Sequence, residues 1–234
     1  MLILQFFSNR NTQKQFRNSL RTFIILSFLI AFTAHAQNHF TILAGPSIAT
    51  MSGSYIKESG TREWGFTAWF LLDKEFNSRW SFEVGFGVVQ KGAKNLLLST
   101  ETSDSTYGYQ TMYMQVPLLM KAKFPFANGK WFVAPYSGLA VSFNTGCKWK
   151  PGNQFEFEEE PCDETTPGGK IEKLELGIPL GAHIWREFPG GSRFMFDVHY
   201  EFGLTNVFEG AAEVNEAARN SVLILMAGFA VPLQ

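Results

Sequence analysis

The chain has 234 residues, of which 45% are hydrophobic, 15% aromatic and 18% charged, and its formal net charge is −1. No apolar run reaches the roughly 18 residues that a membrane-spanning helix requires, and the lack of a net positive charge argues against a nucleic-acid partner. The abundance of Phe (24), Gly (21) and Pro (10) favours strands joined by turns over a helical bundle. A mean hydropathy of −0.04 is compatible with a membrane barrel, because alternating strands average out in such a value.

The first 36 residues have the pattern of an export signal. Their charges are all basic: Arg10, Lys14, Arg17 and Arg21. An apolar run (23–32) and the small-residue site Ala34-His35-Ala36 follow, which is the order found in cleavable signals. We predict a signal peptide over 1–36 and a mature domain over 37–234. The alternative is a membrane anchor, for which about ten apolar residues are few, and the long basic segment leaves the true start codon open. Cleavage leaves 16 of the 20 Lys and Arg against 21 Asp and Glu, a net charge of about −5.

Eight segments further along the chain have the two-residue period of β-strands. The clearest reads RWSFEVGFGVVQKGAK, where apolar residues alternate with Ser, Glu or Gly. In chain order the predicted strands are 39–49, 63–72, 79–94, 111–124, 131–143, 171–185, 193–203 and 221–233. Eight is the strand number of the smallest transmembrane barrels.

The links between these segments alternate strictly between short and long. The short links read DKEFNS, PFANGK and EFPGGS, whereas the long links are 50–62, 91–110, 144–170 and 204–220. Outer-membrane barrels have short periplasmic turns and longer extracellular loops. The pattern therefore predicts an antiparallel, up-and-down barrel with both ends of the mature chain in the periplasm.

The apolar face of these strands is predicted to meet lipid. A soluble lipocalin-like barrel, which is also exported and eight-stranded, would turn that face inward. The face carries about 30 large side chains, and an eight-stranded interior is only wide enough to be filled by side chains. Four tryptophans near strand ends suit the membrane interfaces, although the last of them has the interior parity of its strand: Trp64, Trp80, Trp131 and Trp185.

The opposite face is small and polar, and it is predicted to line a narrow polar lumen. The residues expected to form its network are Glu83, Gln115, Lys121, Lys123, Asp197, His199 and Glu201. Glu83 is expected to pair across strands with Lys121 and Lys123 near the periplasmic end.

One part of this face resembles catalytic chemistry. Asp197 and His199 lie two residues apart with Glu201 beyond, like a fragment of an acid–base relay. No Ser or Thr shares the row to act as a nucleophile, and the alternative is an ion-paired network that plugs a small barrel. Counting outward from the EFPGGS turn places Gly177 and Gly181 opposite Glu201 and Asp197, so that small residues make room for charged ones.

The segment between strands five and six carries both cysteines and a concentration of acid. Cys147 and Cys162 lie downstream of the export signal, where oxidising conditions favour a disulfide over two free thiols. The acidic loop comprises Glu156, Glu158, Glu159, Glu160, Asp163 and Glu164. Capture of a cationic partner or a divalent ion is one reading. The loop lacks the D-x-D-x-D-G pattern of calcium sites, and a loop kept soluble by its charge is the other reading.

Three short motifs resemble those of the PorT-like outer-membrane β-barrel proteins of Bacteroidetes-type bacteria. They are Gln90-Lys91-Gly92, Val116-Pro117-Leu118-Leu119-Met120-Lys121 and Ala134-Pro135-Tyr136-Ser137-Gly138, the last with Ala in place of the usual first Gly. The resemblance covers about residues 63–143 and implies an outer-membrane barrel. The namesake of the family is tied to a protein-secretion apparatus, a role that these motifs alone do not transfer.

The sequence thus predicts an integral protein of the cell outer membrane, an all-β eight-stranded barrel that acts as a structural, binding or assembly component through its extracellular loops. Its expected partners are outer-membrane lipid and a protein bound at those loops. No phosphate-binding glycine loop, zinc spacing or triad motif is present, so we expect no cofactor, no metal and no enzymatic activity. The alternatives are a soluble lipocalin-like ligand carrier and a small barrel enzyme acting on lipid, which would need a serine near His199 or His183.

Overall fold

A computed structural model describes residues 38–58, 61–98, 106–151, 160–163, 166–167, 169–209 and 216–233. The predicted signal peptide and most of the acidic loop lie outside these residues. No helix in the described part of the chain is long and apolar enough to cross a membrane.

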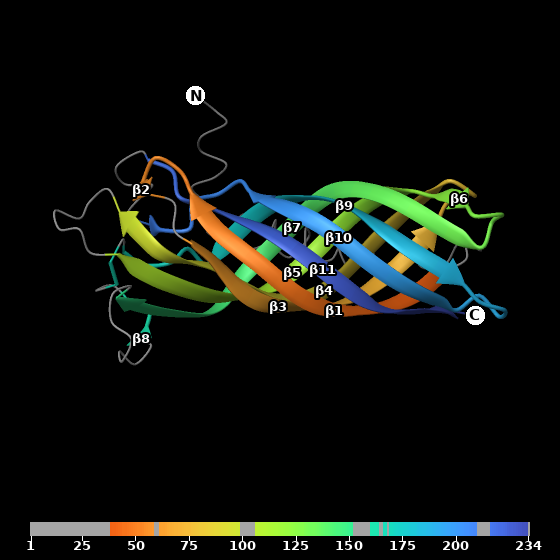
Figure 1. Cartoon of the computed structure of the whole chain (residues 1–234), viewed down its shortest axis with the longest axis horizontal. Coiled ribbons are helices and arrows are strands. Elements are labelled where there is room, and N and C mark those ends of the chain that lie inside the picture. The colour runs from red at the N-terminus through yellow and green to blue at the C-terminus, as the bar shows by residue number, and fades with distance from the viewer. Residues whose placement is uncertain are drawn as a thin grey trace, which may run out of the picture. The chain divides into compact units, whose positions relative to one another are not determined.

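Eight long antiparallel strands close into a barrel (Figure 1). They are β1 (Asn38–Ser52), β3 (Thr61–Glu75), β4 (Trp80–Leu98), β5 (Tyr107–Ala122), β7 (Trp131–Pro151), β9 (Leu174–Glu187), β10 (Arg193–Gly203) and β11 (Arg219–Leu233). Each pairs with the next along the chain, and β1 pairs with both β3 and β11, so that the sheet has no open edge. Three short strands extend the ends: β2 (Ile56–Glu58), β6 (Phe124–Phe126) and β8 (Glu160–Pro161). The predicted all-β, eight-stranded, up-and-down fold is confirmed.

The two ends of the barrel differ. One end, which we call the turn end, holds the start of β1, the end of β11 and the three short links, as predicted. The other end, the loop end, holds the long links, all of which are shorter than expected. The predicted link 91–110 is wrong over much of its length, because β4 continues to Leu98 and β5 begins at Tyr107. The predicted link 144–170 is likewise wrong at its start, because β7 continues to Pro151.

Bulges explain why the alternation did not reveal the end of β4. Gly92 has φ 150° and Asn95 has φ 54°, and the register between β4 and β5 shifts between Ala93 and Leu96. A bulge adds a residue to one strand and breaks the two-residue period. A Cβ at position 92 would collide with the carbonyl oxygen of Tyr109, so this position requires glycine.

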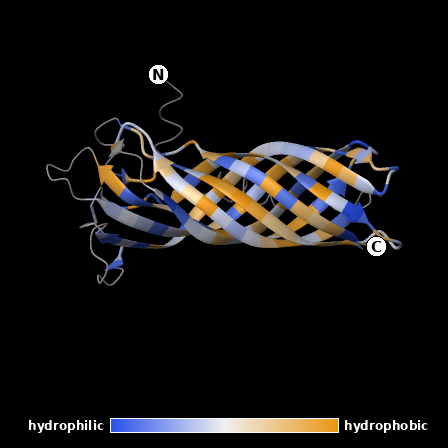
Figure 2. Cartoon of the chain, in the orientation of Figure 1, coloured by the Kyte–Doolittle hydropathy of each residue, from blue (hydrophilic) through white to orange (hydrophobic). Residues whose placement is uncertain are grey.

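The outer wall of the barrel is apolar. Trp64, Phe86 and Phe229 are 62%, 59% and 62% exposed, whereas Glu83, with the opposite parity on β4, is fully buried. Figure 2 shows the alternation of hydrophobic and hydrophilic residues along the strands. Soluble proteins rarely expose so large an apolar surface, and a band of this kind is what the lipid-facing wall of a membrane barrel requires.

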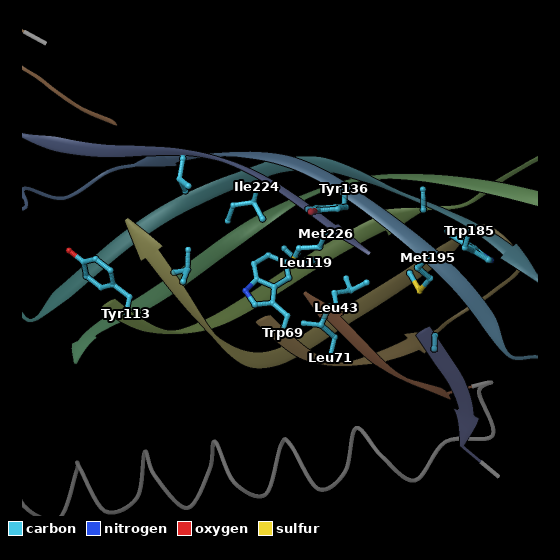
Figure 3. Close-up of a cluster of buried hydrophobic side chains, with 14 of the residues drawn as sticks. Leu43, Trp69, Leu71, Tyr113, Leu119, Tyr136, Trp185, Met195, Ile224 and Met226 are labelled. Atoms are coloured by element: carbon cyan, nitrogen blue, oxygen red, sulfur yellow. The ribbon is translucent and has the colours of Figure 1, made fainter. Parts of the chain in front are cut away.

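The interior is less polar than the sequence predicted. Besides charged residues it contains a continuous apolar cluster in which side chains from opposite walls meet (Figure 3). The labelled members are Leu43, Trp69, Leu71, Tyr113, Leu119, Tyr136, Trp185, Met195, Ile224 and Met226. Inward positions on several strands are large and apolar, so the prediction of a small and polar inner face holds for only part of the lumen. The interior parity of Trp185 is confirmed, because this side chain is buried.

A second apolar cluster closes the loop end, and we call it the cap. The ring of Phe208 lies 6.0 Å from that of Tyr55 and 5.1 Å from that of Tyr109. The other buried members are Met51, Ile56, Ala93, Leu96, Leu98, Ile171, Val207 and Ala218. Residues from β4 and β5 therefore meet residues from three loop-end segments above the lumen.

Candidate functional site

The polar side chains of the lumen form two clusters, of which the first lies nearer the loop end. Lys91 Nζ is 2.6 Å from Glu175 Oε1 and 2.5 Å from Glu201 Oε1, and all three side chains are buried. Gln115 Nε2 donates to the other oxygen of Glu201 at 2.9 Å, and Asn220 Nδ2 donates to the other oxygen of Glu175 at 2.6 Å. We call these five residues the Lys91 cluster. Its members come from β4, β5, β9, β10 and β11 and tie opposite walls together.

The second cluster centres on Asp197 of β10. Asp197 accepts a hydrogen bond from the Tyr136 hydroxyl at 2.7 Å, and its other oxygen lies 2.7 Å from His199 Nδ1. His183 bridges onward, with Nδ1 3.7 Å from Asp197 and Nε2 3.1 Å from Glu83. The ring of His199 stacks on Trp69, with centroids 4.8 Å apart.

Lys121 extends this second cluster toward the turn end. Its Nζ lies 3.1 Å from Glu83 Oε1 and 2.9 Å from Asp73 Oδ2. We call Asp73, Glu83, Lys121, Tyr136, His183, Asp197 and His199 the Asp197 cluster. At the mouth of the turn end, Glu75 forms two ion pairs. Its Oε2 lies 2.8 Å from Lys123 Nζ, and its Oε1 lies 2.9 Å from Arg193 Nη2.

Six of the seven predicted lumen residues lie in these two clusters: Glu83, Gln115, Lys121, Asp197, His199 and Glu201. The predicted contact of Glu83 with Lys121 is present. Lys123 differs, because it lies at the turn-end mouth and forms its ion pair with Glu75 rather than with Glu83. Lys123 lies just beyond the end of β5 at Ala122, outside the row of buried, inward-facing residues of that strand.

The predicted register between β9 and β10 is two residues off. Gly181 lies opposite His199 and Gly177 opposite Gly203, because β9 continues to Glu187 before the turn closes. The idea behind the prediction still holds. A Cβ at Gly177 would lie 2.7 Å from Glu201 Oε1, and one at Gly181 would collide with His199.

Sequence reasoning missed half of the network, although the motifs pointed to it. In the Q-K-G motif, Gln90 Oε1 accepts the Phe66 N–H at 3.1 Å, Lys91 holds two carboxylates and Gly92 forms the bulge. Lys121 ends the second motif and Tyr136 stands in the third. The other missed members are Asp73, Glu175, His183 and Asn220. Motif residues from three strands thus converge in one lumen.

The chemistry of this arrangement is that of buried charges held in place by ion pairs across the lumen. Asp197 and His199 are both buried, and the hydroxyl that contacts Asp197 is that of Tyr136 rather than of a serine or threonine. Within the described ranges, no group of three or more His, Cys, Asp and Glu side chains is arranged to hold a metal ion. The clusters link strands through the interior, which stiffens a narrow barrel.

The predicted disulfide is confirmed. Cys147 near the end of β7 is bonded to Cys162 just after β8, with their Cα atoms 5.3 Å apart, and both pack against the cap with Trp149. Of the acidic loop, Glu160 and Asp163 are described, and Glu160 pairs with Trp149 in the β7–β8 ladder. The remaining predicted acidic residues lie outside the described part of the chain: Glu156, Glu158, Glu159 and Glu164.

Replacing both cysteines with serine is expected to loosen this segment without opening the barrel. In the chain-entropy model, a bridge over 15 residues stabilises by about 3 kcal/mol, so cleavage of the loop by proteinase K should be at least about tenfold faster. The gel mobility of the unboiled protein should not change, since the barrel ladders do not include the bond. The control is the wild type after reduction of the bridge. Equal cleavage rates in the disulfide-bonded wild type and the variant would contradict a structural role for the bridge.

Comparison with known proteins identifies the family. The family model described as "Outer membrane protein beta-barrel domain" matches residues 27–209. The chain belongs to this family. It is an integral barrel of the outer membrane, in agreement with its closed sheet and apolar outer wall. No curated protein sequence matches it.

Several solved outer-membrane proteins are similar to this chain at low sequence identity. A major outer membrane protein from Thermus thermophilus has a TM-score of 0.52 and 13% identity, with 86% of this chain and 100% of that chain covered. The Yersinia pestis attachment invasion locus protein Ail, solved in complex with the heparin analogue sucrose octasulfate, has a TM-score of 0.42 and 14% identity over 83% of this chain and 99% of that one. OprG from Pseudomonas aeruginosa has a TM-score of 0.44 and 13% identity over 86% and 98%.

Proposed function

We propose that the protein is a sealed, non-conducting outer-membrane barrel that acts as a structural, binding or assembly component through its loop end. The observation that carries this proposal is the filled lumen. From the turn-end mouth to the cap, charged clusters and large apolar side chains occupy the interior with little exposure. A diffusion pore needs the opposite, a wide lumen lined by hydrated groups.

We further propose that the loop end faces the outside of the cell. Short turns and both chain ends face the periplasm in barrels of this type, whereas longer loops face outward. The disulfide supports this orientation, because disulfides form and persist at oxidising cell surfaces. A protein partner would then meet the cap, β8 and the acidic segment first.

The same geometry disfavours the enzymatic alternative. Asp197 and His199 are shielded by the walls of the barrel and by Trp69, so a lipid substrate has no access to them. We also place the protein with the PorT-like group on its three motifs. Lys91, Lys121 and Tyr136 of these motifs lie in the lumen, which supports a shared architecture, and a role in secretion would have to come from the loops.

Reconstitution into a planar bilayer tests the sealed lumen. We expect no stable unitary conductance steps from the purified, folded protein, whereas a trimeric porin inserted under the same conditions gives them. An unboiled gel of the same preparation, on which a closed barrel migrates faster than the boiled chain, verifies folding. Reproducible steps from the folded protein would refute the proposal of a sealed barrel, and surface labelling of the reduced cysteines on intact cells tests the orientation separately.

A further inference from the structure

An open hollow lies in the apolar outer wall across β1, β9, β10 and β11, and we call it the wall hollow. Ala227 of β11 forms its floor with Ala44 of β1, and Phe196 of β10 stands on the other side of Ala227. The hollow has a volume of about 410 Å³. The outward-facing residues that line it include Ala44, Ile184, Phe196, Val198, Leu225 and Ala227. An unfilled void forfeits dispersion contacts, so hydrocarbon from the bilayer is the natural occupant of this hollow.

An exposed arginine, Arg186, borders the wall hollow on its turn-end side. Arg186 follows Ile184 on the outward face of β9, near the end of that strand. The side chain of Trp185 between them is buried, with the opposite parity. Two residues along a strand span about 7 Å. The guanidinium of Arg186 therefore stands at the level of lipid head groups when the wall hollow lies in the hydrocarbon.

The charge of Arg186 is not used within the described part of the chain. Its guanidinium lies over the ring of Phe188, with Cζ 5.7 Å from the ring centroid, and it forms no ion pair with any described carboxylate. The adjacent carboxylate, Glu187, lies 3.2 Å from Arg193 Nε. Glu75, at the same mouth, also pairs with Arg193, at 2.9 Å. Both carboxylates are engaged elsewhere, so Arg186 can receive an anion from outside the protein.

We propose that Arg186 and the wall hollow together bind one phospholipid of the leaflet at the turn end. The guanidinium receives the phosphate through two parallel N–H bonds, and the hollow receives part of one acyl chain. An apolar hollow alone accepts any chain and an arginine alone accepts any anion, whereas their juxtaposition selects a molecule that has both groups. The inference rests on the proposed orientation only for the identity of the leaflet, which would be the periplasmic one. Binding in vitro does not depend on that orientation.

The test measures lipid binding by native mass spectrometry of the folded protein, delipidated in dodecyl maltoside and titrated with palmitoyl-oleoyl phosphatidylethanolamine. We expect one lipid to bind more tightly than all others. Arg186→Gln should weaken this binding by roughly tenfold or more, because a charge-assisted hydrogen bond to the phosphate is lost. Ala227→Leu fills the floor of the wall hollow from the lipid side and should weaken the binding by a similar factor of roughly ten.

Two control variants match these changes outside the proposed site. Arg79→Gln removes an arginine that also belongs to the turn end and also lies over a ring, 4.8 Å from that of Phe124, but does not border the wall hollow. Ala122→Leu adds the same bulk on the outward face of β5, away from the hollow. Both controls should bind the lipid as the wild type does. An unboiled gel verifies that every variant is folded.

Each outcome decides the proposal. Loss of binding in both site variants, retention in both controls and weak binding of diacylglycerol with the same chains support it. Wild-type binding in either site variant, equal loss in the controls, or equal binding of diacylglycerol overturns it. Full competition by glycerophosphoethanolamine, which has the phosphate but no chains, would reassign the site to a free anion, and a lipid-free dimer abolished by Ala227→Leu would reassign the hollow to a second copy; either result also overturns the proposal. Conductance steps or inverted labelling would refute the proposed function while leaving this result intact.

Discussion

Replacing Lys91 with methionine is expected to lower the free energy of unfolding by about 3–5 kcal/mol. The substitution keeps the volume of the side chain but removes the cation that holds Glu175 and Glu201. Two buried carboxylates would then repel each other without a counter-charge. The measurement is urea unfolding in detergent micelles, followed by tryptophan fluorescence and by the mobility of the unboiled protein.

Two further variants separate charge pairing from packing. Lys94→Met removes a half-exposed lysine of the same strand and should change the unfolding free energy by less than about 1 kcal/mol. Adding Glu175→Gln and Glu201→Gln to Lys91→Met removes the unpaired charges and should restore most of the lost stability. An unchanged unfolding midpoint for Lys91→Met alone would show that the Lys91 cluster is not a structural element.

Truncation of Trp69 to alanine is expected to destabilise the barrel by about 3–5 kcal/mol. Trp69 is fully buried in the centre of the lumen and stacks on His199. Its removal leaves a cavity that the walls cannot fill, because ladder hydrogen bonds hold the strands at fixed separation. The same unfolding experiment gives the value.

The control for Trp69 stands on the same strand with the opposite orientation. Trp64 of β3 is 62% exposed on the outer wall, so Trp64→Ala removes contact with lipid or detergent and should lose clearly less stability. A greater loss for Trp64→Ala than for Trp69→Ala would mean that the inner and outer faces of β3 have been exchanged. The pair therefore tests the assignment of faces as well as the packing.

Most of the fold was predictable because membrane barrels impose a period of two and an alternation of link lengths. Both signals are local, and they located every long strand. They failed where the two-residue period is interrupted: the bulges at Gly92 and Asn95 concealed the end of β4. They also failed in β9, where two additional residues before the turn changed the partners expected for Gly177 and Gly181.

The site was less predictable because its contacts run across the lumen. Glu83 and Lys121 lie on neighbouring strands, where parity alone brings them together. Lys91 and Glu175 are separated by 84 residues, and no local pattern indicates which inward residues of distant strands meet. The apolar share of the lumen was missed for a related reason, since Trp69 and Tyr113 fall between outward apolar residues and resemble breaks in the pattern.

The cross-lumen ion pairs also constrain how the chain enters its bilayer. Lys91 belongs to the first half of the chain, whereas both its carboxylates come from the last third, and His183 of β9 likewise meets Glu83 of β4. A half-inserted sheet would hold these charges unpaired against hydrocarbon, where an isolated ionised group is very unfavourable. Insertion and closure are therefore expected to be coupled during biogenesis, because the seam between β1 and β11 closes the lumen in which these charges pair.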